Sequence, residues 1–195
     1  MRTAVIERKT KETAIRLSIN LDGCGKTSLN TGIGFFDHML DALCRFAQID
    51  LALDCQGDLQ VDAHHTVEDT GICLGKAIRE ALGDRAGIRR AGSAYMPMDE
   101  ALGFAAIDIS GRPYLAWQAE FSAPMCGTMD TQLAEEFFRA VTVNAGLTLH
   151  MNLIAGRNDH HKMEALFKAF GLALRDAAST DARISGVLST KGSLD

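Results

Sequence analysis

The sequence lacks any apolar stretch that approaches the length of a membrane span. It also lacks a block of lysine and arginine, and its formal net charge of −5 gives no general electrostatic reason to bind nucleic acid or an anionic membrane. The segment MRTAVIERKTKETA at residues 1–14 is too polar to form the core of a signal peptide. We therefore expect a cytoplasmic protein that binds neither nucleic acid nor membranes.

Cysteine is sparse and shows no pairing in the sequence. The five cysteines are scattered, and no two of them form a C-x-x-C pair. An odd number without such pairs argues against a disulfide framework and against a cysteine-based zinc site. We expect reduced thiols, most of them packed in the interior.

What is present is the pattern of a globular α+β protein, with 47% hydrophobic and 23% charged residues. Alternating segments predict strands, and apolar residues at helical spacing predict helices. In the first half, the predicted order is strands at 3–8 and 14–23, a helix at 34–47, a strand at 49–55 and a helix at 64–83. In the second half it is two strands within 103–121, a helix at 131–146, a strand at 147–156 and a helix at 160–177.

This order predicts a duplication. Each half has the order β-β-α-β-α, and we expect residues 1–90 and 91–195 to form two pseudo-equivalent halves packed as one compact unit. Helices should cover one face of each sheet. The tail ISGVLSTKGSLD at 184–195 is rich in glycine and serine, and we expect it to be irregular and available for binding.

Four of the six histidines form two pairs with the same continuation, VDAHHTVEDTG at 61–71 and RNDHHKMEALF at 157–167. Residues four apart on a helix share a face, whereas adjacent residues point about 100° apart. The first histidine of each pair can therefore bind one ion together with the glutamate one turn later. The predicted ligand pairs are His64 with Glu68 and His160 with Glu164.

The second histidine of each pair points elsewhere and is free to reach another centre. The simplest scheme exchanges these histidines between sites, and symmetry adds one ligand from the preceding helix. One predicted site comprises His64, Glu68, His161 and Glu136; the other comprises His160, Glu164, His65 and His38. Imidazole and carboxylate ligands without thiolate favour Mn²⁺, with Fe²⁺ or Zn²⁺ as alternatives.

A set of motifs in one order extends this pattern along nearly the whole chain. They are KETAI, LDGCGKTSLNTGIGFFDHML, GDLQVDAHHTVEDTGICLG, PMDEAL, DISGRP, NDHHKMEALFKAF and STKG. Together they closely resemble the imidazoleglycerol-phosphate dehydratase family of histidine biosynthesis. The resemblance implies two manganese ions per subunit at subunit interfaces, a homo-oligomer of twenty-four subunits, and a duplicated fold similar to domain 2 of ribosomal protein S5. The chain has Glu136 where the family often has histidine, and a carboxylate can still bind manganese.

The reaction implied by the resemblance is loss of water from D-erythro-imidazole glycerol phosphate to give imidazole acetol phosphate. The proton to be removed lies on a carbon with no adjacent carbonyl, so the imidazole ring must accept the electrons. Two metals that each bind one ring nitrogen would make the ring a metal-bound imidazolate, which can expel the neighbouring hydroxyl. The need for a metal at each ring nitrogen explains why two metal centres are expected rather than one.

The resemblance also implies roles for individual residues. Glu12 in KETAI would be the base that removes the proton and would contact the substrate, while His65 and Glu164 are expected to serve both catalysis and metal binding. Cationic side chains and a hydroxyl would bind the phosphate. The predicted substrate-binding residues are Glu12, Arg90, Arg112, Lys162, Ser189 and Lys191.

Two other functions fit the metal ligands alone. One is a dinuclear hydrolase, in which a metal-bound hydroxide attacks an ester or amide. The other is a non-catalytic metal-binding protein, which needs neither a base nor a phosphate pocket. The distance between the two metals would distinguish a hydrolase from a dehydratase. Turnover of the substrate would distinguish a dehydratase from a non-catalytic metal-binding protein.

Overall fold

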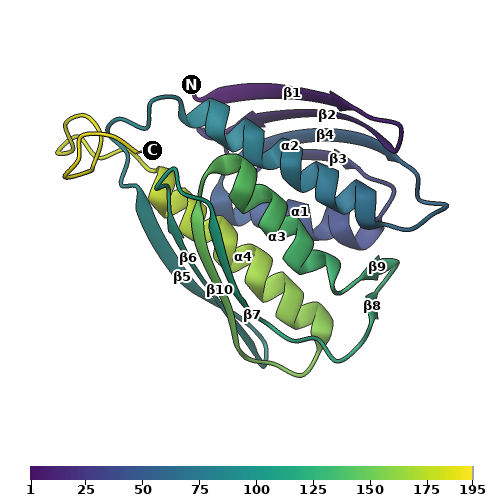
Figure 1. The fold of residues 1–195 in the computed structure, drawn as a ribbon. Coiled ribbons are helices and arrows are strands. Elements are labelled where there is room, and N and C mark those ends of the chain that lie inside the picture. Colours follow the sequence, from purple (N-terminus) through teal and green to yellow (C-terminus); the bar gives the residue numbers. More distant parts are fainter. Residues whose placement is uncertain (195) are drawn as a thin grey trace.

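The computed structural model describes residues 1–194, and its two halves repeat one order of elements (Figure 1). The first half comprises β1 (Thr3–Lys9), β2 (Thr13–Asn20), β3 (Thr27–Asn30), α1 (Gly34–Ala47), β4 (Asp50–Gly57) and α2 (His64–Leu82). The second comprises β5 (Ala91–Met98), β6 (Ala101–Asp108), β7 (Tyr114–Gln118), the short strands β8 (Met125–Cys126) and β9 (Met129–Asp130), α3 (Leu133–Ala145), β10 (Thr148–Ala155) and α4 (Asp159–Ala178). The final residue of the predicted second half, Asp195, lies outside the described residues.

The prediction of two similar α+β halves is confirmed, but each half contains more strands before its first helix than the β-β-α-β-α order allowed. The additional strands are β3 in the first half, and β5 with the two-residue strands β8 and β9 in the second. The strands β3 and β5 contain no fully buried residue, and β3 has only four residues. Without fully buried residues, a strand carries little of the apolar alternation from which strands are predicted.

The two sheets have equivalent topologies. Their strand orders are β1-β2-β4-β3 and β5-β6-β10-β7. In each sheet the first three strands pair antiparallel with one another. The fourth strand pairs parallel with the third. The duplication seen in the sequence therefore extends to strand pairing.

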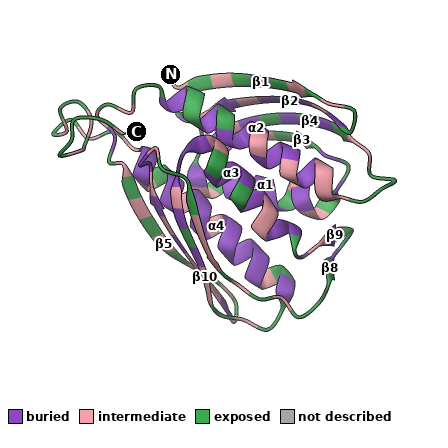
Figure 2. Cartoon of the chain, in the orientation of Figure 1, coloured by how far each residue is buried: buried purple, intermediate pink, exposed green. Residues whose placement is uncertain are grey.

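The four helices lie between the two sheets (Figure 1). The helix α2 packs on β1 and β2, and α4 packs on β5 and β6, so each sheet is covered on one face as predicted. Across the middle, α2 packs against α3 and α1 packs against α4. Figure 2 shows the buried residues concentrated on the inward sides of these elements.

One hydrophobic core joins the halves. It contains apolar side chains from both sheets and all four helices. Phe36 on α1 meets Phe137 on α3 edge to face, with ring centroids 5.2 Å apart, and Phe137 stacks on Phe167 of α4 at 5.4 Å. Such aromatic contacts add to the free energy of burial and restrict how the helices can shift.

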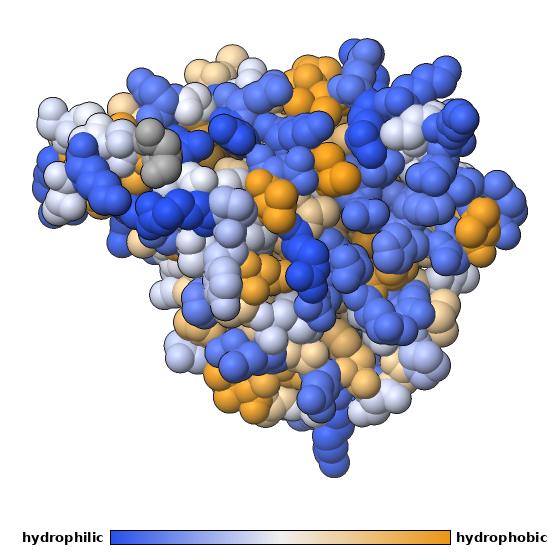
Figure 3. All heavy atoms as spheres, in the orientation of Figure 1, coloured by the Kyte–Doolittle hydropathy of each residue, from blue (hydrophilic) through white to orange (hydrophobic). Residues whose placement is uncertain are grey.

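The face of the molecule shown in Figure 3 is mostly hydrophilic, with hydrophobic groups scattered among polar ones. Within the described residues, no helix combines the length and the apolarity required to cross a bilayer. All five cysteines are free, and four of them are buried, as the sequence predicted for packed thiols.

Candidate metal and active site

The first histidine–carboxylate cluster joins α1 to α4. Oε2 of Glu164 lies 3.2 Å from Nε2 of His160, one turn earlier on α4, and 3.4 Å from Nε2 of His38 on α1. One ligand atom from each of these three residues lies within 4.8 Å of the other two. We call this cluster the α1–α4 half-site. It brings together three of the four ligands predicted for one metal.

The charge of Glu164 suits this arrangement. The side chain is only 8% exposed, and burial favours its neutral form. The hydrogen bond and the charge of Lys168, together with the nearby His38, outweigh that effect and hold the pKa of Glu164 below its usual value. The carboxylate is therefore ionised at neutral pH, as a metal ligand must be.

Local sequence fixes where α4 begins relative to its histidine pair. The side chain of Asn158 accepts hydrogen bonds from the backbone amides of His160 and His161, at 3.0 and 3.3 Å. This is an N-cap, and it places both histidines in the first turn of the helix. Because the glutamate follows four residues after His160, it lies on the same face.

A glycine lets α1 and α4 approach closely enough to form this half-site. A Cβ added at Gly171 would lie 2.5 Å from the carbonyl oxygen of Leu43, closer than real Cβ contacts allow. The equivalent glycine of α2 is Gly75, where a Cβ would lie 2.6 Å from the carbonyl oxygen of Val141 on α3. Each glycine follows the first histidine of its pair by the same number of residues.

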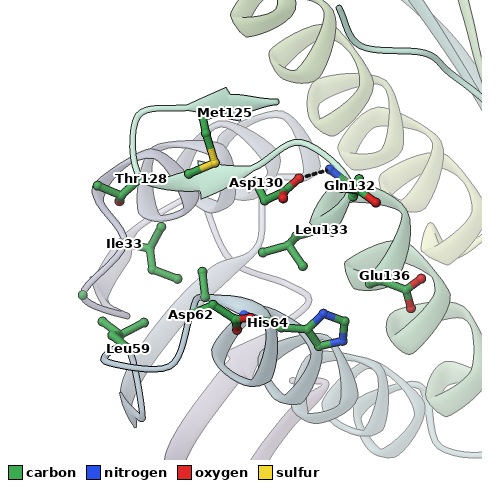
Figure 4. A pocket seen from close by; sticks show the side chains of 12 residues that line it. Ile33, Leu59, Asp62, His64, Met125, Thr128, Asp130, Gln132, Leu133 and Glu136 are labelled. Carbon is green, nitrogen blue, oxygen red and sulfur yellow. Dashed lines mark hydrogen bonds between the residues drawn. The ribbon is translucent and has the colours of Figure 1, made fainter. Parts of the chain in front are cut away.

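The second set of predicted ligands lies on α2 and α3 and is more open. Nε2 of His64 lies 3.8 Å from Oε2 of Glu68. Glu136 on α3 lines the same cavity of ≈ 600 Å³ as His64, and Figure 4 shows both side chains at the edge of this cavity. Glu136 also lies 3.6 Å from Nε of Arg139. We call these three residues the α2–α3 half-site.

The second histidines of the two pairs do not join the half-site of their own helix. His65 lies 3.0 Å from Asp58 through Nδ1 and 3.8 Å from Glu12 through Nε2. His161 bonds through Nδ1 to Glu100 at 2.9 Å. The predicted exchange requires these imidazoles to turn away from their neighbours, and they do. Which metal each one binds stays a prediction.

A cationic cavity of ≈ 680 Å³ lies beside the C-terminal tail. Four predicted phosphate-binding residues line it together with Arg183: Arg90, Arg112, Ser189 and Lys191. Arg90 is fixed there by an ion pair with Asp108 at 2.6 Å and by a hydrogen bond to the carbonyl of Leu188 at 2.8 Å. The arrangement offers several donors to an anion.

Lys162 lies apart from this cavity. It is 6% exposed and binds Oδ1 of Asp159 at 2.8 Å, while Oδ2 of Asp159 accepts hydrogen bonds from the backbone amides of Ser122 and Ala123. These contacts describe a buried ion pair that ties α4 to the segment before β8. Phosphate binding by Lys162 stays a prediction.

Sequence reasoning missed three residues close to the predicted ligands. Asp58 and Glu100 hold the second histidines, and Lys168 forms an ion pair with Glu164. Lys168 also lies 5.1 Å from the ring centre of Phe46. Only Lys168 had a signal in the sequence, because it follows Glu164 by four residues on the same helical face.

The donor sets fit a divalent cation that prefers nitrogen and oxygen ligands. The α1–α4 half-site converges on one point, contains an ionised carboxylate and has two imidazoles whose Nε2 atoms face it. Fold and clusters together define a duplicated α+β protein with two histidine–carboxylate half-sites between its helices.

Comparisons with known proteins identify the family. A family model for imidazoleglycerol-phosphate dehydratase matches residues 31–174. The imidazoleglycerol-phosphate dehydratases of Ruminiclostridium cellulolyticum and Desulfitobacterium hafniense are each 58% identical to the chain, with 100% of the chain covered and 100% and 99% of their own lengths. The chain therefore belongs to the imidazoleglycerol-phosphate dehydratase family. It is a hydro-lyase of histidine biosynthesis.

Solved structures agree with this assignment. A Staphylococcus aureus imidazoleglycerol-phosphate dehydratase superposes with a TM-score of 0.84 at 42% identity, over 92% of this chain and 99% of that one. A Pyrococcus furiosus enzyme, solved in complex with (S)-C348, gives a TM-score of 0.83 at 35% identity, over 97% of this chain and 100% of that one. The duplicated architecture is thus that of the family.

Proposed function

We propose that the chain dehydrates D-erythro-imidazole glycerol phosphate to imidazole acetol phosphate with two Mn²⁺ per subunit, one for each half-site. The observation that carries this proposal is the convergence of His38 and His160 on Oε2 of Glu164, at 3.4 and 3.2 Å. Duplication of the pattern at His64, Glu68 and Glu136 supports a second ion. When bound, the two ions would act as Lewis acids toward the substrate and would stabilise negative charge that develops on its imidazole ring.

Manganese is the metal that the ligand types favour. Both half-sites offer imidazole and carboxylate, and among the described residues none of the cysteines belongs to either cluster. Carboxylate oxygen is a hard donor that suits Mn²⁺, whereas thiolate would favour zinc or iron–sulfur chemistry. The α2–α3 half-site is the harder of the two because it contains two carboxylates and one imidazole.

Glu12 is the proposed base that removes the proton from the carbon attached to the ring. Its side chain is 53% exposed, and within residues 1–194 its carboxylate accepts no hydrogen bond. It is therefore free to contact a substrate and to take a proton. The imidazole of His65, a predicted metal ligand, lies 3.8 Å from the Glu12 carboxylate, so the proposed base is close to a predicted metal-binding residue.

The substrate phosphate is proposed to bind in the cationic cavity of another subunit. His160 lies in the first turn of α4, and the tail with Ser189 and Lys191 follows its last turn. A helix of 20 residues is about 30 Å long. In Figure 1 the tail and the start of α4 lie at opposite ends of the molecule. The short three-carbon chain of the substrate does not reach across that distance, so we propose sites shared between subunits of a homo-oligomer, with twenty-four subunits as the expected size.

A manganese titration of metal-free protein, followed by mass measurement, tests the metal and the assembly together. We expect two Mn²⁺ per chain and growth of small assemblies into one large particle, because ligands from two subunits would meet at each ion. Binding of fewer than two ions would contradict the two-site proposal. Formation of the same particle without metal would contradict the placement of the ligands across interfaces.

A further inference from the structure

The second histidine of each pair is held by a carboxylate from a different element. Nδ1 of His65 lies 3.1 and 3.0 Å from the two carboxylate oxygens of Asp58, which follows β4. Nδ1 of His161 lies 2.9 Å from Oε2 of Glu100, in the turn between β5 and β6. The same contact therefore occurs in both halves, although the carboxylates come from different loops.

These contacts determine which ring nitrogen is available. An ionised carboxylate only accepts hydrogen bonds, so the Nδ1 atom that faces it must carry the proton. In the neutral imidazole, the lone pair is then on Nε2. The first histidines, His64 and His160, already direct Nε2 to the glutamate of their own helix, at 3.8 and 3.2 Å. All four imidazoles would thus bind metal through the same nitrogen.

Glu100 is fixed more firmly than an ordinary surface carboxylate. Its Oε1 accepts hydrogen bonds from the backbone amides of Arg157 and Asn158, at 3.0 and 2.8 Å, just before α4 begins. These bonds and the one from His161 lower the pKa of Glu100 to about 2. One oxygen is therefore occupied by the backbone, and the other is committed to His161.

Glu12 and Glu100 occupy equivalent positions, because each directly precedes the second strand of its half. Their surroundings differ. In the loop before α2, the backbone amide of Asp58 donates a hydrogen bond to the backbone carbonyl of Glu12 at 3.1 Å. This bond does not involve the carboxylate of Glu12, which stays free. In the first half, Asp58 holds the histidine, and in the second half Glu100 does so. The duplicated glutamate has thus diverged into one free and one anchored side chain.

We propose that Asp58 and Glu100 are positioning residues, which hold His65 and His161 as the Nδ1–H tautomer and present Nε2 to metal ions of adjacent subunits. This inference rests on the proposed function, because it assigns a role toward the proposed Mn²⁺. Hydrogen-bonded carboxylates of this kind orient metal-binding imidazoles, and their loss typically costs 10–100-fold in metal affinity.

The variants Glu100→Gln and Asp58→Ala test the proposal. In Glu100→Gln, the side-chain oxygen is needed by the two backbone amides, so the NH₂ group must face His161. An NH₂ group only donates, so Nδ1 must become the acceptor and the proton must move to Nε2. We expect manganese affinity to fall about 10–100-fold. We also expect ¹⁵N spectra of metal-free, histidine-labelled protein to show that one imidazole per chain has changed tautomer.

Asp54→Asn is the control, because Asp54 lies on β4, four residues before Asp58, and its carboxylate accepts a hydrogen bond from Asn30 without contacting a histidine. It should retain manganese affinity and the histidine spectrum. Asp58→Ala removes the acceptor that faces Nδ1 of His65, and it provides an independent test in the other half if Glu100→Gln proves unstable in thermal unfolding. Unchanged affinity and tautomer in folded variants would overturn the proposal. Failure of the unmodified protein to bind manganese would instead overturn the proposed function.

Discussion

His38 and Glu164 meet across the contact between α1 and α4, with 3.4 Å between Nε2 and Oε2. They are 126 positions apart in the sequence (164 − 38), and each belongs to a different half. Their meeting depends on how closely the two helices pack, and Gly171 sets that distance through its contact with Leu43. Core packing and the geometry of the α1–α4 half-site are therefore coupled at this position.

Gly171→Ala should disturb both the packing of α1 against α4 and the geometry of the α1–α4 half-site. The new methyl group would lie 2.5 Å from the carbonyl oxygen of Leu43 and 3.1 Å from the backbone nitrogen of Ala47, so the helices must separate. Overpacking of this kind costs about 1–3 kcal/mol in the free energy of unfolding. Urea denaturation measures the loss. Gly34→Ala is the control, because a Cβ at Gly34 meets nothing within 4 Å and alanine favours a helix. Equal stability of the two variants would contradict the close-packing argument.

Glu136→His should change the metal preference of the α2–α3 half-site. It replaces a hard carboxylate by an imidazole, which suits Zn²⁺ better, so selectivity for Mn²⁺ over Zn²⁺ should fall. Competition between the two metals, followed by metal analysis, measures this selectivity. Glu135→Gln alters the neighbouring carboxylate, which pairs with Arg139, and should leave selectivity unchanged. If both variants keep the original preference, Glu136 is not a ligand.

Glu12→Gln should separate catalysis from metal binding. Removal of a general base typically costs 10²–10⁴-fold in rate. The carboxylate lies 3.8 Å from His65 and outside both half-sites, so the number of bound Mn²⁺ ions should stay at two. Steady-state kinetics and metal analysis on the same preparation test both statements. Normal turnover would remove Glu12 from the mechanism, whereas absence of turnover in the metal-loaded unmodified protein would favour simple metal binding.

Much of the site could be predicted because it follows helical geometry. The spacing of His160 and Glu164 predicts that they share one face, symmetry between the halves assigned His38 to them, and His38 lies 3.4 Å from Glu164. Asp58 and Glu100 could not be found in this way. Their contacts with histidine depend on how the loops dock against the helix starts, and the 61 positions between Glu100 and His161 carry no periodic signal. The same limit applies to β3 and β5, which contain no fully buried residue.

Lys162→Met should act on stability rather than on substrate binding. Lys162 and Asp159 are each 7% exposed at the side chain, and removal of one partner of a buried ion pair costs about 3–5 kcal/mol. The backbone amides of Ser122 and Ala123 still compensate Asp159, so we expect about 3 kcal/mol. Lys191→Met is the comparison: Lys191 is exposed, so stability should persist while KM rises about tenfold or more through loss of a charged hydrogen bond. A raised KM in a fully stable Lys162→Met would support the predicted phosphate contact instead.

The thiols should differ sharply in reactivity. Burial raises the pKa of Cys55 and Cys73 to about 11 and raises that of Cys44 further, and Cys126 is also shifted upward by burial. The thiolate is the reactive form, so at pH 8 a thiol with a pKa three units higher is ionised to only about 0.1%. Cys24 is exposed. A colorimetric thiol reagent should therefore detect one fast thiol per chain in folded, metal-free protein and five after denaturation. The fast thiol should disappear in Cys24→Ser. Two or more fast thiols in the folded protein would show that the interior opens more readily than its packing implies.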